Sequence, residues 1–157
     1  MPDLALDLPD LAATARIAQA LAGRLRRGDV IALYGDLGAG KTAFARFLIQ
    51  ALGVEDEVPS PTFTLVQTYP VDGRDFEAVW HFDLYRIDDP ADVPELGMDE
   101  ALETGVTLIE WPERMGADLP DDRLSIRLSL TQDRRRMTLS GGPSWAGRLP
   151  QPKDLTS

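Results

Sequence analysis

Between residues 29 and 52, an apolar run, a glycine-rich run and an amphipathic run follow one another without interruption. The apolar run, DVIALY at residues 29–34, is short and predicts a strand that is buried on both faces. The amphipathic run begins at Lys41, and its apolar stripe has helical spacing: Phe44, Phe47, Leu48 and Ala51. The order of strand, glycine-rich loop and helix therefore predicts an α/β fold with this strand at its centre.

The glycine-rich run matches the phosphate-binding loop of nucleoside-triphosphate enzymes. Gly35, Gly40, Lys41 and Thr42 fit the pattern G-x-x-x-x-G-K-[ST] without exception. Glycines let consecutive amides approach phosphates without a Cβ in the way, and the following helix directs the positive end of its dipole at them. In such a loop the lysine reaches the terminal phosphates and the threonine hydroxyl ligates Mg²⁺. The residues expected to hold the cofactors, ATP or ADP with Mg²⁺, are Gly35, Asp36, Leu37, Gly38, Ala39, Gly40, Lys41 and Thr42.

Two carboxylates stand near the ends of apolar runs that predict strands. Asp83 lies in WHFDLYR, and Glu110 closes VTLIE. Functional groups of α/β sheets lie beyond the carboxyl ends of the strands, beside the loop, so both are predicted to ligate metal or to orient water. Which carboxylate does which stays open, although Glu110 is favoured, with Thr42, for the metal. The absence of an N-K-x-D sequence favours ATP over GTP.

Other residues of chemical interest carry weaker signals. Thr62, in SPTF, lies where enzymes of this class place a switch that senses the terminal phosphate. His81 is two positions before Asp83 and is interpreted as a packed, hydrogen-bonded histidine rather than a general base. Trp111 is able to stack on a base or a partner. The arginines at 134–136 are interpreted as part of a solvated turn.

Composition limits the classes of protein that this chain can be. Its 157 residues carry a net charge of −10, and 43% of them are hydrophobic, which suits one folded domain. Residues 52–122 hold 19 acidic and 3 basic side chains, which disfavours a broad nucleic-acid-binding face there and leaves only the arginines near the C-terminus for a local basic patch. The absence of cysteine excludes a disulfide framework and a cysteine nucleophile. Without a membrane or signal segment, the expected location is cytoplasmic.

The remaining patterns predict how the chain is organised. A strand at 4–8 and a helix from 11 precede the central strand, and short helices are expected within 88–102. Further strands are expected as two antiparallel pairs and one buried strand: 62–69 with 77–85, 124–130 with 137–140, and 106–110. One domain is predicted over residues 1–140, followed by a flexible tail at 141–157 that is rich in Gly and Pro.

Taken together, four blocks resemble one family. GDLGAGKT, SPTF, HFDLYR at residues 81–86 and IEWPE at residues 109–113 have the order and spacing of the bacterial TsaE (YjeE) ATPases, which act in threonylcarbamoyladenosine modification of tRNA. The resemblance implies a P-loop NTPase-like, three-layer α/β fold with a central mixed sheet, and ATP with Mg²⁺. It also implies work beside the partners TsaB and TsaD, with hydrolysis resetting their complex, and contact with tRNA only through that complex.

The same resemblance assigns roles within the blocks. Lys41 and Thr42 would hold phosphate and metal, Thr62 would be the switch, Asp83 and Glu110 the acidic catalytic or metal-site residues, and Trp111 the tryptophan beside the nucleotide. Hydrolysis is expected to be slow alone and faster with partners, because no arginine is identified as a finger by its position. Two alternatives remain: a small-molecule kinase, and a nucleotide-dependent binding module without significant hydrolysis.

Overall fold

The computed structural model describes residues 3–36, 38–55, 65–132 and 134–150, and a mixed sheet runs through them. In the described ranges the sheet has seven strands in the order β1-β7-β6-β2-β5-β4-β3. The strands are β1 Leu4–Leu8, β2 Val30–Tyr34, β3 Val66–Pro70, β4 Ala78–Asp83, β5 Val106–Glu110, β6 Leu124–Thr131 and β7 Arg134–Gly141. Strand β2 lies parallel to β5 and β6, and β4 lies parallel to β5. The pairs β1–β7, β6–β7 and β3–β4 are antiparallel.

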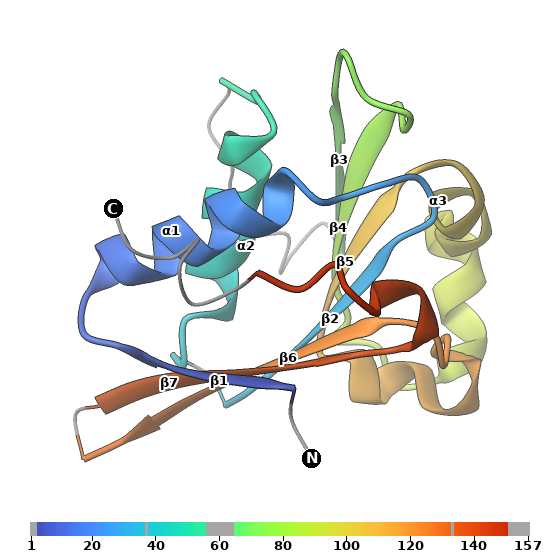
Figure 1. Cartoon of the computed structure of the whole chain (residues 1–157). Helices are drawn as coiled ribbons and strands as arrows, with labels where there is room; N and C mark the ends of the chain where they lie inside the picture. Colours follow the sequence, from blue (N-terminus) through green and yellow to red (C-terminus); the bar gives the residue numbers. More distant parts are fainter. Residues whose placement is uncertain (1–2, 37, 56–64, 133, 151–157) are drawn as a thin grey trace.

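Helices cover both faces of this sheet (Figure 1). On one face, α1 (Leu11–Ala22) and α2 (Lys41–Ala51) lie side by side. On the other face lie α3 (Met98–Thr104) and the 3₁₀ helices η1 (Pro90–Leu96) and η2 (Pro112–Asp118). None of the helices in the described ranges has the length and apolarity that a membrane crossing requires. The expected three-layer α/β fold with a mixed sheet is confirmed.

The central strand is apolar along its whole length because each face of it enters a different core. Ile31 and Leu33 pack with α1 and α2, whereas Val30 belongs to the cluster formed with α3, η1 and η2. Strand β5 divides in the same way, with Leu108 in the first core and Ile109 in the second. This two-sided burial places the carboxyl ends of β2 and β5 next to each other in the middle of the molecule.

The antiparallel pairs expected from the sequence are present. Strands β3 and β4 pair as predicted, although residues 62–64 of the expected first strand lie outside the described residues. Strands β6 and β7 also pair, but β7 begins at Arg134, so the interpretation of residues 134–136 as a solvated turn is wrong. These arginines belong to a strand because they pair with β6, and two of them, Arg135 and Arg136, also pair with β1.

A flexible tail is expected from residue 141, but residues 141–150 form ordered structure that packs on the domain. Strand β7 runs to Gly141, a 3₁₀ helix η3 (Pro143–Trp145) follows, and Trp145 is 1% exposed. Arg148 then forms a bidentate ion pair with Asp29, with nitrogen–oxygen distances of 2.8 and 2.9 Å. The Gly-rich and Pro-rich sequence conceals this packing, because a single buried tryptophan and one ion pair leave no periodic pattern. Residues 151–157 lie outside the described ranges.

Candidate functional site

The loop between β2 and α2 has the backbone that a phosphate cradle requires. Gly35, Gly38 and Gly40 have φ angles of 144°, 82° and 108°, a range that side-chain-bearing residues rarely adopt. A Cβ on Gly35 would lie 2.5 Å from the carbonyl oxygen of Leu128 on β6, so only glycine fits there. Gly40 is the N-cap of α2 and has no side chain to bond its first amides, which therefore face outward for an anion.

Lys41 is buried at the start of α2. It is 5% exposed, its Nζ donates a 2.6 Å hydrogen bond to the carbonyl oxygen of Gly35, and the same nitrogen lies 3.5 Å from the centroid of the Trp111 ring. Burial lowers the pKa of Lys41, while the nearby carboxylates of Glu110, Glu113, Asp83 and Asp36 raise it. A desolvated ammonium held by a carbonyl oxygen and a ring face is prepared to exchange them for a phosphate.

Glu110 is the centre of a buried hydrogen-bonded chain. It is 2% exposed; its Oε1 accepts from the Thr42 hydroxyl at 2.9 Å, and its Oε2 lies 2.7 Å from His81 Nε2. His81 is fully buried, and its Nδ1 has no hydrogen-bond partner in the described structure. A proton on Nε2 suits this environment because Nε2 then donates to Glu110, whereas a proton on Nδ1 would be a buried donor without an acceptor. The interpretation of His81 as a hydrogen-bonded core histidine is confirmed, and Glu110 is its partner.

Asp83 stands beside Glu110. It is the last residue of β4, is 4% exposed, and pairs with Glu110 in the parallel register of β4 and β5. One of its oxygens, Oδ1, accepts a hydrogen bond from the backbone N–H of Tyr85 at 3.0 Å. The two carboxylates thus lie at the carboxyl ends of adjacent strands, as predicted from the sequence.

Trp111 covers the site from the start of η2. Its backbone lies in the left-handed region, with φ 59° and ψ 51°, a conformation that costs a bulky residue about 1–3 kcal/mol. The ring lies 5.0 Å from that of Tyr85, centroid to centroid, and contacts the Lys41 ammonium. The strained turn therefore directs an aromatic face at the lysine of the loop.

One pocket of about 480 Å³ brings most of these residues together. It is lined by Gly38, Gly40, Lys41, Thr42, Asp83, Glu110 and Trp111, and also by Leu11, Ala43 and Arg135. Gly35, Asp36 and Ala39 line an adjoining hollow on the other flank of the loop. The predicted site residues Leu37 and Thr62 lie outside the described residues.

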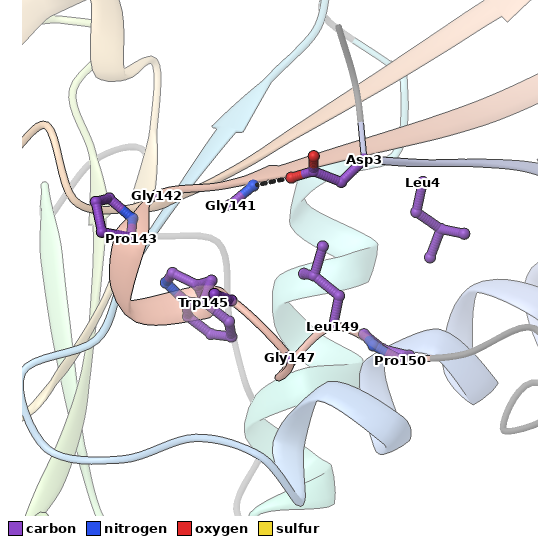
Figure 2. Close-up of a pocket in the computed structure, with 10 residues that line it drawn as sticks. Asp3, Leu4, Gly141, Gly142, Pro143, Trp145, Gly147, Leu149 and Pro150 are labelled. Atoms are coloured by element: carbon purple, nitrogen blue, oxygen red, sulfur yellow. Dashed lines mark hydrogen bonds between the residues drawn. The ribbon is translucent and has the colours of Figure 1, made fainter.

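A larger pocket, of about 770 Å³, lies elsewhere, between the first strand and the segment that ends at Pro150 (Figure 2). The carboxylate of Asp3 is its one charged group among the described residues, and it already accepts a hydrogen bond from the Gly141 N–H at 2.8 Å. Because this pocket gathers no set of chemical groups from the described ranges, the smaller pocket beside the loop is the candidate site.

Leu11 and Arg135 are the site residues that sequence reasoning missed. Both line the pocket, and Leu11 is 54% exposed. A signal for Arg135 exists in the alternation of β7, where Met137 and Leu139 face the core with α1 and α2. Arg135 lies two residues before Met137 and therefore on the same face of β7 as Met137 and Leu139. Arg134 and Arg136 lie on the opposite face and are exposed.

The residues present fit a magnesium nucleotide. Within the described ranges no group of three or more His, Asp or Glu side chains forms a cage for a metal ion. Mg²⁺ does not require one, since it is commonly bound by one or two protein oxygens together with substrate phosphates and water. The hydrogen-bonded Thr42 hydroxyl and Glu110 carboxylate, next to the buried Lys41, supply such oxygens beside a phosphate cradle.

Comparison with known proteins gives one consistent result. The family model described as "Threonylcarbamoyl adenosine biosynthesis protein TsaE" matches residues 8–138. The chain is 39% identical over 125 residues to the tRNA threonylcarbamoyladenosine biosynthesis protein TsaE from Rickettsia bellii (strain RML369-C), covering 79% of this chain and 85% of the relative. It is 40% identical over 124 residues to the protein of the same name from Bacillus subtilis (strain 168), covering 78% and 75%. The crystal structure of Bacillus subtilis YdiB superimposes with a TM-score of 0.77 at 32% identity, covering 94% of this chain and 93% of that one.

Proposed function

Because the chain belongs to the TsaE family of threonylcarbamoyl adenosine biosynthesis proteins, we propose that it is a Mg²⁺-dependent ATPase that hydrolyses ATP to ADP and phosphate in that pathway. The observation that carries the proposal is the contact between the Thr42 hydroxyl and Glu110 at the mouth of a phosphate loop. A loop lysine, a hydroxyl and a carboxylate in this order are the parts that P-loop enzymes use to bind a magnesium nucleotide.

The two carboxylates have different hydrogen-bonding environments, and this supports separate roles. Each oxygen of Glu110 contacts a side chain of the protein, Thr42 or His81, which holds the carboxylate in one orientation and suits a group that helps to hold Mg²⁺. Asp83, the neighbouring carboxylate in the register, is then the group that orients the attacking water. When bound, Mg²⁺ supplies charge neutralisation on the terminal phosphates.

The remaining groups bind the nucleotide and exclude water. The Lys41 ammonium exchanges the Gly35 carbonyl oxygen for a terminal phosphate, and the loop amides hold the diphosphate. Trp111 keeps solvent from the lysine, and Thr62 is the proposed switch residue. No arginine is assigned to the transition state, so turnover by the chain alone is expected to be slow.

The proposal extends to the setting of this activity. We propose that hydrolysis supports turnover of a complex of TsaB-type and TsaD-type proteins during tRNA modification in the cytoplasm. In this scheme the chain meets tRNA only through that complex. The support is family membership together with the strongly acidic residues 52–122, which disfavour a direct phosphate-backbone contact there.

The proposal is tested by measuring phosphate release from ATP by the purified chain, alone and with the two partner proteins. Glu110→Gln is the site variant, and Glu100→Gln, which changes an exposed carboxylate on α3, is the matched control. We expect slow release alone, faster release with partners, and a loss of about 100-fold or more in Glu110→Gln only. If ATP binds but releases phosphate under no condition, a binding module replaces the ATPase; if the phosphate moves to a metabolite, a kinase does.

A further inference from the structure

Half of the sheet has an open face. The helices α3 and η2 contact β2, β4 and β5, and they lie at that end of the sheet (Figure 1). Strands β6, β7 and β1 continue the sheet away from those helices, on the other side of β2. The side chains of these three strands that turn away from α1 and α2 are exposed or half-buried in the described ranges.

This open face is basic. It carries three exposed arginines, Arg127 on β6 and Arg134 and Arg136 on β7, and we call the surface around them the arginine face. The arginines alternate with side chains such as Leu128 and Met137, which are buried in the core with α1 and α2. The other side chains of β6 and β7 on the face are small hydroxyls: Ser125, Ser129, Thr138 and Ser140.

The arginine face has little acidic counterpart in its own chain. Asp7 is the one carboxylate that the described parts of β1, β6 and β7 contribute to it, and it lies in register with Arg136. Neither Arg134 nor Arg136 forms a side-chain hydrogen bond or an ion pair with another described residue. A group of exposed guanidiniums that a chain of net charge −10 leaves without carboxylate partners attracts an acidic surface from outside.

The arginine face adjoins the phosphate loop. The guanidinium carbon of Arg127 lies 5.0 Å from the centroid of the Tyr34 ring, and Tyr34 directly precedes Gly35, the first glycine of the loop. Arg127 and Ser129 also line the hollow on the flank of the loop that Gly35 lines. A molecule that binds the arginine face would therefore contact the strand ends that support the loop.

An acidic protein surface fits the arginine face better than a nucleic acid does. Carboxylates border the face: Asp7 stands on β1, and the exposed Asp121 and Asp122 precede β6. A phosphate backbone that continued past the arginines would meet these like charges. A protein partner is able to present a compact acidic patch that ends where the arginines end.

We propose that the arginine face docks an acidic surface of a partner protein, an inference that rests on the partner dependence in the proposed function. Arg127, Arg134 and Arg136 are the contact residues. Docking there brings the partner against the ends of β2 and β6, beside the loop, and so affects nucleotide turnover without any contact with the reacting phosphates.

The experiment titrates the purified chain with the complex of TsaB-type and TsaD-type proteins by calorimetry, in the presence of Mg²⁺ and an ATP analogue that is not hydrolysed. Arg134→Glu and Arg136→Glu reverse charges of the arginine face, and Arg26→Glu, at an exposed arginine outside it, is the matched control. We expect each face variant to raise the dissociation constant about tenfold or more, and the control to stay within about twofold of the wild type. Added salt should weaken the wild type more than the face variants.

Two further measurements separate docking from other effects. Phosphate release from ATP by the chain alone should stay within about twofold of the wild type in all three variants, because none of the three arginines lines the candidate site. Thermal unfolding shows whether each variant is folded. Arg136→Gln, which removes the charge without reversing it, repeats the comparison should Arg136→Glu be unstable.

Distinct results overturn this inference and the proposed function. If both face variants bind the complex as tightly as the wild type, the arginine face is not the docking surface and the ATPase proposal stands. If the wild type does not bind the complex, the proposed partners are wrong and the docking inference fails with them, while phosphate release by the chain alone still tests the ATPase. If the wild type alone binds tRNA and the face variants do not, a nucleic acid replaces the protein partner. If the wild type self-associates in sedimentation and the face variants do not, the occupant is a second copy of the chain.

Discussion

The hydroxyl of Thr42 donates a hydrogen bond of 2.9 Å to Glu110 Oε1, and this contact joins the first turn of α2 to the end of β5 across 68 residues of sequence. Because His81 holds the other oxygen of Glu110, the carboxylate is fixed from two sides before any ligand arrives. Such preorganisation favours a metal-holding role, since the carboxylate need not reorient when nucleotide binds.

His81 is predicted to position Glu110. His81→Phe removes the donor to Glu110 Oε2, whereas His81→Gln retains an N–H at about the same reach. We expect His81→Phe to raise the Mg²⁺ concentration needed for half-maximal ATP hydrolysis about tenfold and to lower stability by about 1–3 kcal/mol, with partial rescue in His81→Gln.

The matched control for His81 is Thr107→Val. Thr107 is also buried in the sheet, and its hydroxyl has no hydrogen-bond partner in the described structure. Its replacement should leave the Mg²⁺ dependence unchanged. A purely structural role for His81 would lower stability without shifting the Mg²⁺ dependence, and that outcome would contradict the prediction.

Lys41 should make folding stability depend on pH at the alkaline end. Burial lowers its pKa below the ordinary value of 10.5, which the unfolded chain retains. Between the two pKa values the unfolded chain binds more protons, so the free energy of unfolding rises with pH in that range. The stability of the wild type minus that of Lys41→Met should therefore increase as pH rises toward 10.5, measured by denaturant unfolding without nucleotide or Mg²⁺. A difference that falls or stays flat with pH would reject the lowered pKa.

Trp111 should report nucleotide binding. In the structure its ring contacts the Lys41 ammonium, and we expect this contact to loosen when the lysine turns to phosphate. Adding ADP should change the tryptophan emission of the wild type, and the change should disappear in Trp111→Phe, which keeps Trp80 and Trp145. Unchanged ADP affinity of that variant by calorimetry would show that the signal, rather than binding, was lost. If ADP changed the tryptophan emission of Trp111→Phe as much as that of the wild type, the change would come from Trp80 or Trp145 and not from Trp111.

Arg148 should stabilise the fold although it follows the domain boundary expected from the sequence. It forms a bidentate ion pair with Asp29, whose side chain is nearly buried. Arg148→Ala leaves that carboxylate without its partner and should lower the free energy of unfolding by about 3 kcal/mol. Asp29→Asn in the Arg148→Ala background should recover part of the loss, measured by denaturant unfolding. If Arg148→Ala were as stable as the wild type, the ion pair would not stabilise the fold. The domain boundary at residue 140 that is expected from the sequence would then stand.

Much of the fold was predictable because its strongest signals are local. The glycine pattern at Gly35 and Gly40 defines the loop backbone, and the unbroken apolar run before it defines a strand buried on both faces. The carboxylates ending VTLIE and in WHFDLYR could be placed at the site from the general rule for parallel strands. The partner of His81 was not predictable, because its contact with Glu110 depends on the pairing of β4 with β5.

The sequence by itself determined the phosphate loop, the central strand and the two carboxylates, because each depends on neighbouring residues and on backbone sterics. Only the tertiary structure decided that Glu110 is held between Thr42 and His81, that Arg135 faces the loop, and that residues 141–150 pack onto the sheet. Strand order and register set these contacts, and both result from burial across the whole chain rather than from any local pattern.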